Sequence, residues 1–134
     1  MKGPNETAAI RSSAYELYSG REYNKAIPIL EQFVADGQAI EDDYFYLGLS
    51  YLYNHEPSKA VNPLLHIYEG EGMERKDAVT WFLSVAYVAS ADCDNAKPLL
   101  NKVASQTGSK GKQKLANHAK ELLKVIATEG CTKK

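Results

Sequence analysis

One short string recurs three times along the chain and constrains what it can fold into. It reads AIPIL from Ala26, AVNPLL from Ala60 and AKPLL from Ala96, at intervals of 34 and 36 residues. A repeat of this length is one supersecondary unit, and a single unit cannot bury its own apolar face. The sequence therefore predicts several copies that pack against one another.

The middle copy shows what each unit contains. Apolar and small residues recur every three or four positions in its first half, as on one face of a helix: Tyr44, Leu47, Gly48 and Tyr51. Residues 54–57 interrupt the pattern. Ser58 is a suitable N-cap for a second helix that carries Ala60 and Leu64. Each unit is therefore expected to be two helices joined by a tight turn.

This order of aromatic, Leu-Gly, Tyr and Ala resembles the tetratricopeptide repeat family. The resemblance covers about residues 6–106 and is strongest in the middle copy. In the first copy Ile10 stands in place of the aromatic residue, and in the third Thr80 does. The family resemblance implies an all-α, right-handed helical solenoid of three helix-turn-helix repeats.

The predicted domain is a single one over residues 1–134. The repeats occupy about 6–36, 40–70 and 75–106, and a C-terminal helix at about 112–127 caps them. Within the repeats we expect helices at about 6–19, 25–35, 76–89 and 95–105, with Asn24 capping the second of them. The C-terminal helix places its leucines on one face and its lysines on the other.

The net charge of −1 conceals a separation of charge. Residues 31–74 contain nine acidic side chains and one lysine, whereas residues 95–134 contain nine lysines and two glutamates. This pattern fits solvated helix faces, a patch that steers a partner, or head-to-tail association of copies. Nucleic acid is not an expected partner, because the basic segment 108–114 has no aromatic residues for base stacking.

Three features of the sequence bear on the compartment. The chain has no run of 18 apolar residues, its first residues do not form a signal peptide, and Cys93 and Cys131 form no C-x-x-C pair. We expect a buried thiol at Cys93 and a cytoplasmic protein without direct membrane insertion, if the chain is complete. A weaker resemblance, carried by DAVTWFLSVAYV, DNAKPLLNKVA and KELLKVI, is to soluble C-terminal domains of bacterial membrane-anchored tetratricopeptide proteins. It would make this chain an excised domain, with a periplasmic location possible.

No pattern of catalytic residues stands out. His55, His66 and His118 are isolated from one another, and no phosphate-binding loop or nucleophile motif is present. The sequence predicts no enzyme activity, no catalytic residue, no metal site and no cofactor.

The family resemblance places the binding surface on the first helix of each repeat, which lines a concave groove. The residues that it assigns to a partner peptide are Arg11, Tyr15, Asp42, Phe45, Tyr46, Leu49, Trp81, Phe82 and Val85, with Tyr53 as a possible addition. The rings could instead serve only inter-helix packing, or the chain's own terminus or a second copy could fill the groove. Of the five positions that form a carboxylate clamp in some family members, only Arg11 has a suitable side chain here.

The expected function is therefore a non-catalytic adaptor or scaffold that binds a protein or peptide partner in an aromatic, apolar groove. The alternative is a self-associating structural module, such as a homodimer, which the weaker resemblance would make the soluble domain of a larger membrane-anchored protein.

Overall fold

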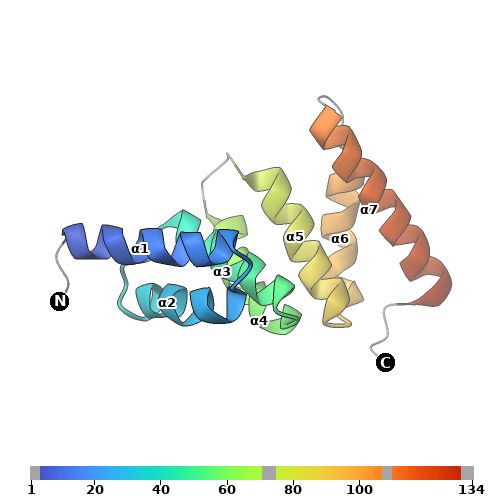
Figure 1. Ribbon diagram of the computed structural model, residues 1–134. Coiled ribbons are helices and arrows are strands. Elements are labelled where there is room, and N and C mark those ends of the chain that lie inside the picture. Colours follow the sequence, from blue (N-terminus) through green and yellow to red (C-terminus); the bar gives the residue numbers. More distant parts are fainter. Residues whose placement is uncertain (1–3, 71–74, 107–109, 131–134) are drawn as a thin grey trace. The chain divides into compact units, whose positions relative to one another are not determined.

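The computed structural model describes residues 4–70, 75–106 and 110–130 (Figure 1). These residues form seven α-helices and no strand, so the predicted all-α class is confirmed. The helices are α1 (Pro4–Ser19), α2 (Tyr23–Ala35), α3 (Glu41–Tyr53), α4 (Pro57–Glu69), α5 (Lys76–Ala89), α6 (Cys93–Ala104) and α7 (Lys110–Glu129). The predicted helix at residues 76–89 is reproduced, and the bounds predicted for the other helices differ by at most two residues at an end.

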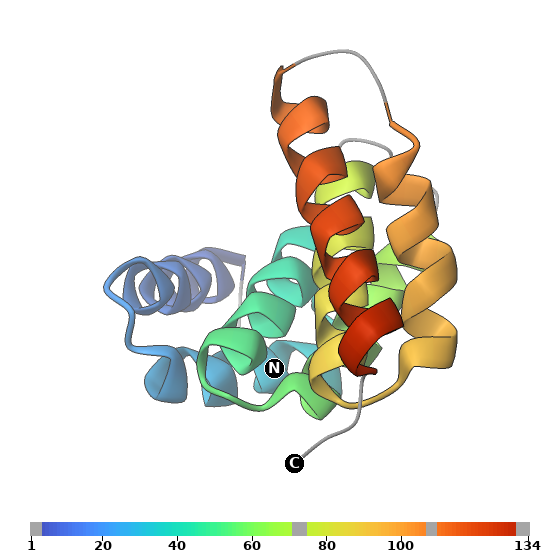
Figure 2. The same cartoon turned by 90° about the vertical axis from the view of Figure 1, so that its right-hand side faces the viewer.

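The contacts divide the chain into two compact units, Met1–Ile67 and Tyr68–Lys134. In the first unit α1 and α2 lie side by side and antiparallel, and α2 also packs against α3 (Figure 1). In the second unit α6 packs against both α5 and α7 (Figure 2).

Three connections between helices have the same backbone turn. One residue in each has a positive φ of 63°, two positions before the next helix begins: Arg21, His55 and Ala91. In each turn the following amide donates a 2.8 Å hydrogen bond to a carbonyl five residues earlier, as from Glu22 N to Leu17 O. This bond closes the end of the preceding helix in the Schellman manner. The turns therefore recur at the same intervals of 34 and 36 residues as the repeated sequence string.

The turn sets the start of the next helix and corrects two predicted caps. Helices α2 and α4 begin at Tyr23 and Pro57, so Asn24 and Ser58 lie inside the first turn rather than at the N-cap. Proline favours the first helical position because its fixed φ suits a helix and it has no amide hydrogen to satisfy. Because each of the three turns is followed by a helix that begins two residues later, Ala26, Ala60 and Ala96 are each the fourth residue of their helix. All three are fully buried.

The close approach of α3 and α4 depends on Gly48. A Cβ atom at this position would lie 2.6 Å from the Cγ atom of Leu64, whose side chain is fully buried. Only the absence of a side chain lets the two helices reach this distance, because a buried leucine has no space to move into. The Leu-Gly pair of the middle repeat is thus a packing requirement.

The second unit has its core between α6 and α7. Ala96, Leu100 and Val103 of α6 pack against Ala119 and Ile126 of α7. The predicted apolar face of the C-terminal helix is confirmed, since its leucines pack partly buried against this cluster while its lysines are exposed. Over the described residues, no helix has the length and apolar character needed to cross a membrane.

The prediction of a buried free thiol at Cys93 is wrong. Cys93 is half-buried at the start of α6 and is disulfide-bonded. The sequence contains one other cysteine, Cys131, which lies outside the described residues. Sequence spacing excluded a local C-x-x-C pair but carried no information about a cysteine brought near by the fold.

Candidate functional site

Five tyrosine rings in the first unit form a continuous series of contacts, which we call the tyrosine ladder. Its members are Tyr15 and Tyr18 of α1, Tyr23 of α2, and Tyr46 and Tyr53 of α3. The ring of Tyr46 lies 4.8 Å from those of both Tyr15 and Tyr18, measured between centroids. From Tyr18 the series continues to Tyr23 at 5.7 Å and then to Tyr53 at 5.3 Å. These distances are those of favourable aromatic pairs.

The local sequence explains why the rings meet. Tyr15 and Tyr18 are three residues apart, and Tyr46 and Tyr53 are seven apart, so each pair lies on one face of its helix. Tyr23 is the first residue of α2, directly after the turn at Arg21. That turn reverses the direction of the chain, so the ring of Tyr23 packs against the ring of Tyr18 near the end of α1.

A buried ion pair fixes one end of the tyrosine ladder. Asp43 is fully buried and receives hydrogen bonds from Arg11 Nε at 3.0 Å and from the Tyr15 hydroxyl at 2.6 Å. The backbone amide of Ile40 also donates to Asp43, at 3.0 Å. Arg11 has a further bond to the Gln38 carbonyl oxygen, and its guanidinium lies 4.7 Å from the centroid of Phe33. These bonds fix the position of the Tyr15 ring, and they occupy hydrogen-bond donors of the Arg11 guanidinium.

The rest of the tyrosine ladder is open to hydrogen bonding. In the part of the chain that the structure describes, no group accepts a hydrogen bond from the hydroxyls of Tyr18, Tyr23, Tyr46 and Tyr53. Tyr53 is 48% exposed, and the other rings are half-buried. The surface thus offers ring faces together with donors that are available to a bound molecule.

Burial raises the pKa of two hydroxyls of the tyrosine ladder, those of Tyr15 and Tyr18. Burial raises the pKa of Tyr18 to about 12, and the neighbouring Tyr53 and Tyr23 add to the increase. Burial also raises the pKa of Tyr15, with a further contribution from its hydrogen bond to Asp43. At neutral pH the hydroxyls of Tyr15 and Tyr18 therefore keep their protons.

The structure brings some of the predicted site residues together. Tyr15 and Tyr46 are in the ladder, and the ring of Phe45 lies 5.6 Å from that of Tyr46. Leu49 is buried at 4% exposure, whereas Asp42 is half-buried near Tyr15. Arg11 belongs to the Asp43 ion pair.

The three predicted residues of the second unit lie on α5. Trp81, Phe82 and Val85 are all half-buried. Trp81 packs against the α6–α7 core, and its ring centroid is 5.9 Å from that of His118 on α7. Packing within the second unit therefore accounts for part of the tryptophan surface.

Sequence reasoning missed Tyr18 and Tyr23 and included Tyr53 only as a possible addition. The three-residue spacing of Tyr15 and Tyr18 would have indicated a shared face. Tyr23 carried no such signal, because its position depends on the turn before α2.

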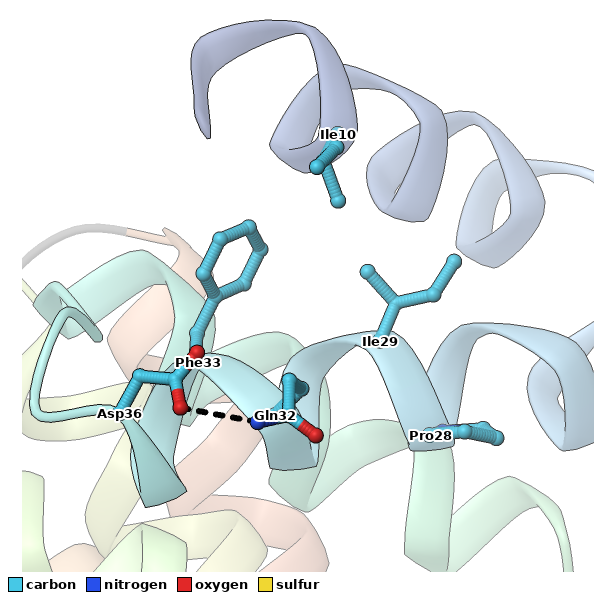
Figure 3. Close-up of a pocket in the computed structure, with 6 residues that line it drawn as sticks. All are labelled: Ile10, Pro28, Ile29, Gln32, Phe33 and Asp36. Atoms are coloured by element: carbon cyan, nitrogen blue, oxygen red, sulfur yellow. Dashed lines mark hydrogen bonds between the residues drawn. The ribbon is translucent and has the colours of Figure 1, made fainter. Parts of the chain in front are cut away.

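Two cavities also open on the first unit. One, of about 240 Å³, lies between α1 and α2, where Ile10 faces Ile29 and Phe33 (Figure 3). A 2.9 Å hydrogen bond from Gln32 to Asp36 closes its polar edge. The second, of about 350 Å³, is lined from α2, α3 and α4 and contains Tyr44 stacked on His66 at 3.9 Å.

Comparisons with protein-family models, with curated proteins and with solved structures found no match.

Proposed function

We propose that this chain is a non-catalytic protein-interaction module of the tetratricopeptide type, and that a partner peptide binds on the tyrosine ladder. The observation that carries the proposal is the ladder itself: five rings from three helices, partly exposed, with four hydroxyls that have no partner among the described residues. Tyrosine supplies a large contact area at a low cost in side-chain entropy, and it is enriched in protein interfaces.

The repeat assignment has its own support. The three buried alanines occupy the same register in α2, α4 and α6, and the same positive-φ turn precedes each of these helices. A periodic sequence with periodic backbone geometry is what a repeat architecture requires. In this proposal α1–α2, α3–α4 and α5–α6 are the three repeats, α7 is the capping helix, and Trp81, Phe82 and Val85 remain predicted contributors to binding.

The disulfide at Cys93 favours the alternative compartment. Disulfides persist in oxidising environments such as the bacterial periplasm and are rare in the cytosol. We therefore favour the periplasmic assignment over the cytoplasmic one in this proposal.

Selection from a displayed library of random peptides tests the function. The wild-type protein should enrich a common sequence, and a Tyr23→Leu/Tyr53→Leu variant should bind the enriched peptide at least about tenfold more weakly. Tyr68→Leu, which removes a half-buried tyrosine of the second unit, is the matched control and should bind like the wild type. Circular dichroism should show the same helix content for all three. No enrichment, or equal binding by the ladder variant, would contradict the proposal.

A further inference from the structure

We infer that the tyrosine ladder selects basic peptides, with a lysine or arginine side chain of the partner held against the rings at the Tyr23–Tyr53 end. This inference rests on the proposed function and adds the chemistry of the ligand. Three observations carry it: the charge of the first unit, the way this chain already holds lysines on a tyrosine, and the exposure of the end of the ladder.

The first unit is acidic. Residues 1–67 contain nine Asp and Glu side chains and five Lys and Arg side chains, a net charge of −4. Three of the five cations are neutralised by ion pairs inside the unit, in which Arg11, Lys25 and Lys59 pair with Asp43, Glu22 and Glu56. The net negative charge therefore lies on other side chains and attracts cations to this unit.

Tyr68, in the second unit, shows how a tyrosine of this chain holds a cation. The Nζ atom of Lys76 lies 4.2 Å from the centroid of the Tyr68 ring, and the Nζ atom of Lys102 lies 5.4 Å from it. Lys102 also donates a 2.7 Å hydrogen bond to the Tyr68 hydroxyl. Lys76 Nζ also donates to the backbone carbonyl oxygen of Tyr68. The ring face and the hydroxyl oxygen of one tyrosine thus contact two ammonium groups, one of which the backbone also holds.

The Tyr23–Tyr53 end of the tyrosine ladder offers the same two groups without an occupant from the described residues. The two rings are stacked with 28° between their planes, and Tyr53 is 48% exposed. Their hydroxyl oxygens accept no hydrogen bond within the described ranges. An ammonium or guanidinium group can reach both a ring face and a hydroxyl oxygen here, in a unit whose net charge favours its approach.

A fluorescein-labelled peptide of alternating lysine and glycine tests the inference by anisotropy. It should bind the wild-type protein, and binding should weaken as salt is added. Tyr53→Leu should lower the affinity by about tenfold because leucine has no aromatic quadrupole, whereas Tyr53→Phe should lower it by less. Tyr68→Leu is again the control and should leave the affinity unchanged. Peptides in which glutamate or leucine replaces lysine should bind at least tenfold more weakly.

The outcomes separate this inference from the proposed function. If the leucine peptide binds as tightly as the lysine peptide and also depends on Tyr53, the ladder binds peptides but the charge preference is wrong. If neither peptide binds and the library enriches nothing, both proposals fail. If the protein alone associates in sedimentation runs at low salt, and Tyr53→Leu abolishes the association, the lysines of a second copy are the occupant and the inference of a separate partner is overturned.

Discussion

Asp43 links residues from two helices of the first unit, because Arg11 and Tyr15 of α1 both donate to its side chain on α3. It is fully buried, and its charge is balanced by Arg11, the Tyr15 hydroxyl and the Ile40 amide. Removing one partner of a buried pair leaves a charge without compensation, which costs several kcal/mol. The stability of the unit therefore depends on a contact between residues 32 positions apart.

Arg11→Met tests this dependence. The substitution keeps a long apolar stem but removes the guanidinium, so we expect the free energy of unfolding to fall by about 3 kcal/mol in urea titrations. Lys25→Met is the matched control, because Lys25 pairs with Glu22 on the exposed surface. Equal urea midpoints for the two variants would show that the buried pair contributes no more than a surface pair.

The raised pKa of Tyr18 predicts a loss of stability at alkaline pH. An unfolded tyrosine ionises near pH 10, whereas burial raises the pKa of Tyr18 to about 12. Between these two pH values the folded state keeps the Tyr18 proton, whereas the unfolded state loses it. The contribution of Tyr18 to the free energy of unfolding is therefore complete below about pH 10 and disappears as the pH rises through about 12. Tyrosinate absorbance should show a late group of tyrosines that ionises with the loss of helical signal, and Tyr18→Phe should move that unfolding to higher pH. Ionisation of all tyrosines in one early step, with the helices intact, would contradict this.

At this scale the family resemblance, and not helical spacing, placed Tyr15, Phe45 and Tyr46 on one surface. The rings of Tyr15 and Phe45 do each contact the ring of Tyr46. The burial of Asp43 was not predictable in the same way. An acid in the first turn of a helix is also what a dipole contact would use, and the distinction depends on a distant arginine.

At the scale of the elements, the recurring turn carries a backbone cost. Arg21, His55 and Ala91 occupy the left-handed region, which a residue with a Cβ atom adopts at a cost of about 1–2 kcal/mol. The end of α2 uses the same region at Gly37, where φ is 71° and glycine has no such cost. The protein therefore contains the same kind of turn with and without strain.

Two reciprocal substitutions measure that cost. We expect Ala91→Gly to raise the free energy of unfolding by about 0.5–1 kcal/mol, because glycine relieves the strain but loses more entropy on folding. Gly37→Ala should lower it by about 1 kcal/mol, since no atom within 4 Å would meet the new methyl group and only the backbone changes. Thermal unfolding of both variants checks the pair. Destabilisation by Ala91→Gly would mean that the methyl group packs more favourably than its strain costs.

The elements themselves were largely predictable, and their boundaries were less so. Periodicity indicated all seven helices because apolar faces recur over several turns. The starts of α2 and α4 differed because a hydrogen-bonded turn, and not Asn24 or Ser58, determines where these helices begin.

At the scale of the whole molecule, each of the two units is stabilised internally by different interactions. The first contains the Asp43 ion pair and the tyrosine ladder, and the second contains the α6–α7 core and the disulfide at Cys93. The disulfide could not be read from the sequence, because pairing depends on which cysteines the fold brings close. The charge separation was visible from the sequence and underlies the ligand proposed for the first unit.

Reduction of the disulfide should lower the stability of the chain. A disulfide typically contributes about 2–4 kcal/mol by restricting the unfolded state. We expect a lower thermal midpoint in the presence of a reducing agent, and no further effect of that agent on a Cys93→Ser variant. An unchanged midpoint on full reduction, verified by a thiol assay, would show that the bond does not stabilise the fold.

The most direct test of the account is a nuclear magnetic resonance titration of the wild-type protein with its tyrosine rings labelled. The chain has nine tyrosines, five in the ladder and four elsewhere: Tyr44, Tyr51, Tyr68 and Tyr87. On addition of the lysine–glycine peptide, the signals of Tyr23 and Tyr53 should shift most, the other ladder signals less, and the remaining four not at all. Shifts confined to Tyr44 and Tyr51, which line the larger cavity, would place the ligand there and contradict the tyrosine ladder as the binding surface.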